Sequence, residues 1–214
     1  MFVAEDSRRL LTSPDGITWI GRYSEPNQNS ISHVASVHSQ FVAVGNAGAI
    51  ATSPNAIDWT RQTVGTPSTL SGVAYGNGTF VAAGWNGEAL VSQDGASWAR
   101  HNFGTNNEIS SLAFGKGLFV GCSSFGLAQP LFTSSDGITW NPHIAHYPVC
   151  LTHVTYGADT FVAVGWDADG QGGAIVTSTN GTNWVSRTVP TTNLLNAVAF
   201  GGGLFVAAGT KGTI

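Results

Sequence analysis

An internal repeat constrains the fold of this chain more than any other feature of its sequence. A short apolar segment that opens with phenylalanine returns six times, at Phe2, Phe41, Phe80, Phe119, Phe161 and Phe205. The successive intervals are 39, 39, 39, 42 and 44 residues. Self-similarity at this period, without a helical pattern, is typical of propeller blades of four strands each. The sequence therefore predicts an all-β chain built from one recurring sheet unit.

A polar turn closed by tryptophan recurs five times at nearly the same period. It reads TSPDGITW at 12–19 and returns as SPNAIDW at 53–59, SQDGASW at 92–98, SSDGITW at 134–140 and STNGTNW at 178–184. A carboxylate oxygen of Asp15, Asp94 or Asp136 can accept backbone N–H groups inside such a turn, and the next glycine tolerates positive φ. Asn55 and Asn180 offer the same kind of oxygen. We expect each turn to join the last two strands of a repeat, with the tryptophan folded back over the hairpin.

One complete repeat can be read between residues 68 and 104. We expect strand A in LSGVAYG (70–76), strand B in TFVAAG (79–84), strand C in EALVSQ (88–93) and strand D in ASWARH (96–101). The small side chains of strand B allow close packing near a central axis, and the larger ones of strand D fill the wider rim. Strand direction alternates, so the A–B and tryptophan turns share one face, and the B–C turns and D–A linkers share the other.

The tryptophan turns resemble the Asp-box of sialidase-type repeats, usually written Ser-x-Asp-x-Gly-x-Thr-Trp. Here the form is Ser-x-Asp-Gly-x-Thr-Trp, which is one residue shorter. The resemblance covers nearly the whole chain and implies a β-propeller. Asp-boxes occur in sialidases, lectins, photosystem assembly factors and surface proteins, so the resemblance by itself implies no single function.

The ends of the chain bear on the number of blades. Residues 11–214 make five whole repeats, and residues 1–10 duplicate the portion at 205–214. We expect a single domain, 1–214, of five four-stranded antiparallel blades. The closing blade would be composite, with strand A from the C-terminus and strands C and D from the N-terminus, and either copy of strand B would serve. The alternative is six blades with incomplete terminal blades. The chain could also be a fragment of a larger repeat protein, or its spare terminal strands could pair in a homo-oligomer.

Composition excludes several classes of function. Charged residues make up 9% of the chain, the net charge is −4 and the longest basic run is Arg8–Arg9, so we expect no nucleic-acid binding. No apolar run approaches the roughly 20 residues of a membrane helix, so we expect no membrane insertion. Two cysteines form no disulfide framework. We expect Cys122 and Cys150 to be free thiols, with a bridge between neighbouring repeats as the alternative.

The spacing of the repeats indicates where a ligand binds. From each tryptophan to the next phenylalanine the interval stays at 21 or 22 residues, whereas from phenylalanine to tryptophan it grows from 17 to 23. The added length lies between strands B and C, and binding residues commonly lie on such variable loops. An aromatic platform beside carboxylates and amides would suit a sugar. The candidate ligand-binding residues of these loops are Trp85, Asn86, Glu88, Trp166, Asp167 and Asp169. The alternative is that the two tryptophans pack on neighbouring blades.

Two further candidates are His33 and His153, which share one repeat position just before the valine of strand A. We expect them near the mouth of the channel, either as ligand-binding residues or as hydrogen-bonded core histidines. The acidic segment WDADGQG (166–172) lacks the frame of an EF-hand loop. We therefore expect no metal site and no cofactor.

The resemblance to sialidases invites a test of catalysis. Those enzymes need three arginines on a substrate carboxylate, a Tyr–Glu nucleophile pair and an acidic aspartate. Four arginines here follow the repeat tryptophans, which assigns them to the outer strand of each blade; they are Arg22, Arg61, Arg100 and Arg187. The sequence therefore predicts no catalytic residues. It favours a non-catalytic, lectin-like module whose partner is a glycan, and the alternative is a structural propeller that binds another protein.

Overall fold

The computed structural model describes residues 1–6, 8–26, 29–37, 40–124, 130–144, 149–167, 169–170 and 172–214. These residues form six antiparallel sheets. The first comprises β1 (Phe2–Asp6), β2 (Arg9–Ser13) and β3 (Ile20–Ser24). The second comprises β4 (Ile31–Val37), β5 (Gln40–Gly45), the 3-10 helix η2 (Asn46–Gly48), β6 (Ile50–Ser53) and β7 (Thr60–Gln62). The third comprises β8 (Leu70–Gly76), β9 (Thr79–Gly84), η3 (Trp85–Gly87), β10 (Glu88–Ser92) and β11 (Ala99–Asn102).

The remaining three sheets repeat the same order. The fourth comprises β12 (Ser111–Gly115), β13 (Leu118–Cys122), β14 (Leu131–Ser134) and β15 (Asn141–His143). The fifth comprises β16 (Val149–Gly157), β17 (Thr160–Asp167), β18 (Gly173–Ser178) and β19 (Val185–Arg187). The sixth comprises β20 (Leu195–Gly201), β21 (Leu204–Gly209) and η4 (Thr210–Gly212). The predicted succession of strands A to D is confirmed in the four complete sheets, where each strand pairs with the next along the chain.

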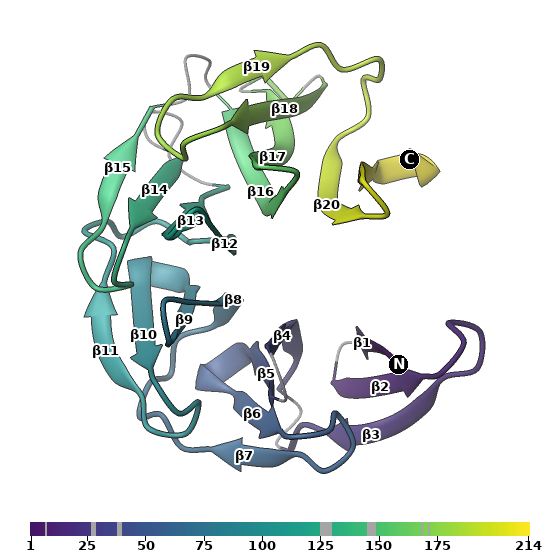
Figure 1. Ribbon diagram of the computed structural model, residues 1–214, viewed down its shortest axis with the longest axis vertical. Helices are drawn as coiled ribbons and strands as arrows, with labels where there is room; N and C mark the ends of the chain where they lie inside the picture. Colours follow the sequence, from purple (N-terminus) through teal and green to yellow (C-terminus); the bar gives the residue numbers. More distant parts are fainter. Residues whose placement is uncertain are drawn as a thin grey trace.

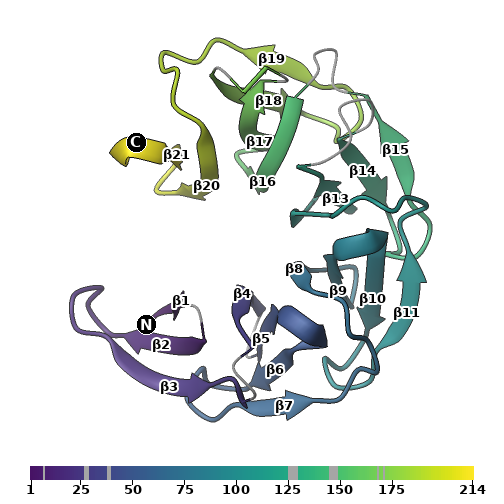
Figure 2. The same ribbon diagram turned by 180° about the vertical axis from the view of Figure 1, so that it is seen from behind.

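The six sheets stand side by side in an open arc around a central axis (Figure 1). The first strands of the complete sheets, together with β20, line the opening, and each contacts the first strand of its neighbour. The fourth strands β7, β11, β15 and β19 follow the outer rim, which the view from behind also shows (Figure 2). This radial arrangement is the one that the repeat predicts.

The two ends of the chain lie on opposite sides of the gap in the arc (Figure 1). The three-stranded first sheet and the two-stranded sixth sheet do not pair with each other. The strands of the predicted composite blade are therefore not paired with one another in this structure, and the two terminal sheets are incomplete. The physical reason is that each copy of strand B is held in its own sheet. β1 pairs with β2 along its whole length, from Phe2 opposite Ser13 to Asp6 opposite Arg9. β20 pairs with β21 and therefore does not pair with β1. The number of blades, five or six, stays a prediction.

The tryptophan turns have the local structure that the sequence predicts. In the fourth sheet the Asp136 Oδ1 atom accepts the backbone N–H groups of Ile138 and Thr139, both at 2.8 Å. The indole N–H of Trp140 donates to the Gly137 carbonyl at 3.0 Å. Asn180 replaces the aspartate in the fifth sheet and accepts the equivalent two N–H groups at 3.0 and 2.9 Å. A side-chain oxygen is thus the requirement, whether it belongs to a carboxylate or an amide.

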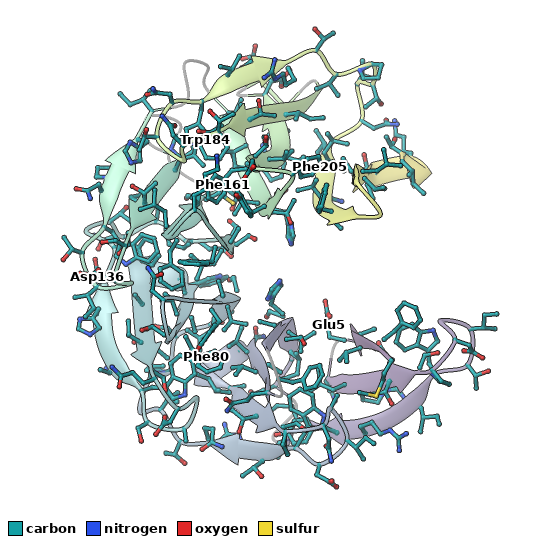
Figure 3. All side chains as sticks on the ribbon, viewed as in Figure 1. Glu5, Phe80, Asp136, Phe161, Trp184 and Phe205 are labelled. Carbon is teal, nitrogen blue, oxygen red and sulfur yellow. The ribbon has the colours of Figure 1, made fainter. Side chains whose placement is uncertain are left out.

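Each sheet packs closely on the next through the ends of its strands. A β-carbon on Gly115 would lie 2.3 Å from the ring of Tyr156 in the following sheet, and one on Gly137 would lie 2.4 Å from Cγ2 of Val81 in the preceding sheet. The core fills the spaces between neighbouring sheets. Phe161 and Trp184 are almost completely buried there, with ring centroids 6.4 Å apart (Figure 3).

Both cysteines are free thiols, as the sequence predicts, and Cys122 is buried. Burial raises the pKa of the Cys122 thiol far above its usual range. Within the described residues, no helix has the length and apolar character needed to cross a membrane.

Candidate functional site

The turns sort onto the two faces that strand alternation predicts. On one face, the Asn77 side-chain amide in an A–B turn donates to the Gly117 carbonyl at 3.1 Å and to the Ser135 carbonyl at 3.0 Å. On the other, Gly87 in a B–C turn donates its N–H to the Asn107 carbonyl of the D–A linker at 2.7 Å. The candidate loops therefore rest on the D–A linkers.

Trp85 lies on a tight, well-supported turn. It opens η3, where Asn86 at φ +59° and Gly87 at φ +62° reverse the chain. The Trp85 N–H donates to the Thr69 carbonyl at 2.9 Å, so the turn is tied to the start of β8. The indole nevertheless remains 53% exposed. Its position in the repeat is taken by Asn46 and Thr210 in η2 and η4, so the fold itself does not require a tryptophan here.

A cleft of about 350 Å³ opens beside this indole. It is lined by Trp85, Asn86, Asn106, Asn107 and Glu108. One carboxylate oxygen of Glu108 accepts the Ser71 hydroxyl at 3.0 Å, which holds this side chain against β8. The three linker residues did not emerge from the sequence as candidates. The sequence does contain a feature that indicates them. The polar segment TNNE (105–108) lies in a D–A linker, and these linkers share the face of the B–C turns.

Glu88 does not line this cleft, although it follows Trp85 closely in the sequence. Its side chain is buried beneath the turn, and its Oε1 atom accepts the Nε–H of Arg100 at 2.7 Å. Its Oε2 atom accepts the Thr66 hydroxyl at 2.8 Å. Burial by itself would raise the pKa of Glu88, but hydrogen bonds from Ser68, Thr66 and Arg100 outweigh it and lower the pKa below the usual value. The carboxylate is engaged within the fold.

Trp166, Asp167 and Asp169 belong to a different part of the arc. They lie in and just after β17 of the fifth sheet, and the fourth sheet separates them from Trp85 (Figure 1). The Trp166 indole is half-buried and hydrogen-bonds the Cys150 thiol. Asp167 donates its N–H to the Gly172 carbonyl at 3.1 Å, which closes the hairpin. The structure therefore does not bring the two candidate tryptophans into one cleft.

The four arginines that follow the repeat tryptophans lie on the outer strands, as predicted. Arg22 and Arg187 donate from Nε to threonine hydroxyls of the neighbouring strand, at 2.8 Å in both cases. Arg61 donates from Nε to the buried carboxylate of Glu25 at 2.8 Å. Each arginine lies at the rim of a different sheet, so these four do not converge on a substrate at the axis.

His33 and His153 lie in a second, axial cavity of about 290 Å³, away from the Trp85 cleft. The sequence places them at one repeat position, and the structure shows that this position faces the axis. A larger groove of about 750 Å³ runs along the tryptophan turns of the third and fourth sheets, where Trp98, Asp94 and Asp136 line it. The two aspartates there support the turns through backbone hydrogen bonds, as in the other repeats.

No protein-family model and no curated protein sequence matches the chain. Solved structures do. The chain is similar to virginiamycin B lyase from Staphylococcus aureus, with a TM-score of 0.78 at 14% identity over 92% of this chain and 69% of that one. It is similar to YCF48 bound to D1 peptide, with a TM-score of 0.67 at 16% identity over 95% and 69% of the two chains.

A third similar structure is the WD40 β-propeller domain of Doa1, with a TM-score of 0.63 at 14% identity over 85% of this chain and 62% of that one. These neighbours differ in the activities and partners that their names describe, and identities this low relate architecture rather than chemistry. Together with the radial arc of sheets, the similarity shows that this chain has a β-propeller fold.

Proposed function

We propose that this protein is a non-catalytic binding module and that the Trp85 cleft binds a carbohydrate. The observation that carries the proposal is an indole left 53% exposed on a turn that the fold holds in place. A rigid aromatic face covers the C–H face of a sugar ring at low entropic cost. The amides of Asn86, Asn106 and Asn107 supply both donors and acceptors for hydroxyl groups.

The composition of the cleft favours binding over glycoside hydrolysis. Hydrolysis by the usual route needs two carboxyl groups on either side of the scissile bond. Among the residues that line the Trp85 cleft, Glu108 alone carries a carboxylate, and Ser71 donates a hydrogen bond to it. Such a carboxylate is suited to orient a hydroxyl group. Some structural neighbours are named as enzymes, but at such low sequence identity their activities do not transfer to this chain.

The experiment is a glycan array followed by titration calorimetry with the glycan that binds best. Trp85→Asn is the decisive variant, because Asn46 occupies the same turn position in the second sheet and the fold accommodates it. We expect this variant to keep the wild-type melting temperature and to lose roughly fivefold or more in affinity, since stacking on one aromatic ring contributes of order 1 kcal/mol or more. Trp166→Ala is the matched control and should bind normally. A wild-type protein that binds no glycan on the array would contradict the proposal.

A second candidate function is self-association through the terminal sheets. Val206 is 49% exposed on β21, whereas Val81 at the same repeat position is completely buried. Phe2 is 55% exposed on β1, whereas its counterpart Phe80 is 2% exposed. Apolar side chains that are buried in the complete sheets but exposed in the terminal ones are suited to contact with another protein surface. The exposed face of the sixth sheet can pack against the first sheet of a second copy, as neighbouring sheets pack within the arc. β1 occupies the edge of β2, so this contact is face to face and adds no strand to the sixth sheet.

Light scattering with size-exclusion chromatography tests this second candidate. We expect a species of twice 22.2 kDa at micromolar concentration. Val206→Asp should shift it to the monomer, because a charge would be buried at the interface. Val185→Asp, which alters an exposed valine on β19 of the complete fifth sheet, should leave the dimer unchanged. A wild-type monomer at all concentrations would rule out self-association and leave the glycan proposal untouched.

A further inference from the structure

Two histidines from non-adjacent sheets face each other across the axial opening. His33 lies on β4 of the second sheet and His153 on β16 of the fifth, and their ring centroids are 6.1 Å apart at an interplanar angle of 48°. Each follows a β-bulge in its strand, and the two pair with equivalent partners, Val44 and Val164. The curvature of the arc therefore brings together two imidazoles that are distant in the sequence.

Both rings have an unpartnered nitrogen. The Nδ1 atoms of His33 and His153 are buried, and neither has a hydrogen-bond partner within the described part of the chain. Buried polar atoms in folded proteins are hydrogen-bonded in the large majority of cases, and an orphaned one is costly. Two such atoms on residues that line one cavity are available to a ligand that enters it.

The state of the rings suits a metal ligand. The backbone of Val198 hydrogen-bonds the ring of His153, while the Nδ1 atom of that ring has no partner within the described residues. A backbone contact of this kind orients an imidazole, as outer-shell carbonyls do at metal sites. The unpartnered nitrogens of both rings are available to an ion in the cavity.

The geometry and the surroundings agree with that role. Two imidazoles that bind one zinc ion at about 2.0–2.1 Å each would place their ring centroids roughly 5 to 6.5 Å apart, and the observed separation is 6.1 Å. The same position in the other inner strands carries the small residues Gly72, Ser111 and Ala197, so there is room at this level of the axis. The cavity of about 290 Å³ can hold water molecules as further ligands.

The donor set restricts the kind of ion. No group of three or more His, Cys, Asp and Glu suited to a metal occurs among the described residues, so the protein would supply two nitrogen ligands and no carboxylate. Imidazole suits zinc, copper and nickel, whereas magnesium and calcium prefer oxygen. We propose that His33 and His153 form an open transition-metal site in the axial cavity, with Zn²⁺ as the representative ion and water in the remaining positions.

The first experiment titrates ZnCl₂ alone into tag-free, chelator-treated full chain by calorimetry. We expect one ion per chain and a rise in melting temperature, because an ion that binds only the folded state stabilises it. His33→Ala and His153→Ala should each weaken binding by at least roughly tenfold, since each removes one of two protein ligands. His101→Ala, which alters a histidine on the outer strand β11, is the matched control and should bind as the wild type does. Equal binding by all three variants, or no binding by the wild type, would overturn the proposal.

A second measurement does not depend on the folding of the variants. Cu²⁺ bound to the wild-type protein at one equivalent should show, by pulsed electron paramagnetic resonance, coupling to the remote nitrogens of two equivalent imidazoles. Coupling to a single imidazole, or none, would contradict the site even if zinc bound elsewhere. The Trp85→Asn variant should retain the two-imidazole signal, which separates this site from the proposed glycan cleft.

Discussion

The Nε atom of Arg100 lies 2.7 Å from a carboxylate oxygen of Glu88, and both residues belong to the third sheet. The arginine side chain is largely exposed, whereas the glutamate side chain is 7% exposed and also accepts the Thr66 hydroxyl. Strand D of the third sheet, which carries Arg100, is thereby joined to strand C of the same sheet, which carries Glu88. Thr66 adds the linker between the second and third sheets to this contact. Glu88 supports the turn that carries Trp85, and its contribution to ligand binding is indirect.

Glu88→Gln is expected to destabilise the protein. The glutamine side chain has the same shape as glutamate but lacks the negative charge that Arg100 and Thr66 stabilise. We expect this loss to lower the free energy of unfolding by about 1–3 kcal/mol. Urea denaturation monitored by tryptophan fluorescence measures this loss. The control is Asp6→Asn, which breaks the exposed ion pair with Arg9 and should change the free energy of unfolding very little. Equal effects of the two substitutions would refute the structural role of Glu88.

The five repeat tryptophans should differ in their contribution to stability. Trp184 is 2% exposed against Phe161, whereas Trp19 in the incomplete first sheet is 40% exposed. Trp184→Ala should lower the free energy of unfolding by about 3–5 kcal/mol, and Trp19→Ala should lower it much less. Thermal unfolding of both variants checks the order. The reverse order would mean that the terminal sheet is covered in solution, as self-association requires.

Two glycines with nearly the same backbone conformation should respond differently to substitution. Gly137 has φ +75° and Gly16 has φ +78°, so an alanine at either position costs about 1–2 kcal/mol for the left-handed conformation. A β-carbon at Gly137 would also lie 2.4 Å from Cγ2 of Val81, whereas one at Gly16 would lie no closer than 3.7 Å to Phe2. Gly137→Ala should therefore cost about 1–3 kcal/mol more. Chemical denaturation of both variants provides the comparison.

The tryptophan turns should make stability sensitive to acid. Backbone N–H groups, foremost that of Ser97, lower the pKa of Asp94 to about 2, and the pKa values of Asp15 and Asp136 are lowered by the same kind of bond. A carboxylate whose pKa is lower in the folded state stabilises the protein above its unfolded value of 3.8. That stabilisation is lost as the pH falls through the folded pKa.

The triple variant Asp15→Asn, Asp94→Asn and Asp136→Asn removes this titration and keeps the accepting oxygens, as Asn55 and Asn180 do naturally. Its urea midpoint should therefore fall less than that of the wild type between pH 5 and pH 2. If the urea midpoints of the two proteins fell by the same amount as the pH is lowered, the turns would not depend on carboxylate charge.

The amino-acid sequence by itself determined every feature that depends on near neighbours in the chain. Asp94 reaches the N–H groups of Ala96 and Ser97, two and three residues away, so the turn follows from the local residue types. Hairpins between successive strands, and hence the faces to which the loops belong, follow in the same way. The recurrence of these local units was enough to predict the propeller.

Only the tertiary structure decided the features that depend on how the sheets curve around the axis. The Thr66 hydroxyl, 22 residues earlier in the chain, donates a hydrogen bond to Glu88. The Glu88 carboxylate is therefore engaged beneath the turn and does not line the cleft beside Trp85, where its sequence position had placed it. The arc also brings His33 opposite His153 and leaves Trp85 and Trp166 on separate sheets. The distance between residues on different sheets depends on how every intervening sheet packs on the next. No short stretch of sequence specifies that packing.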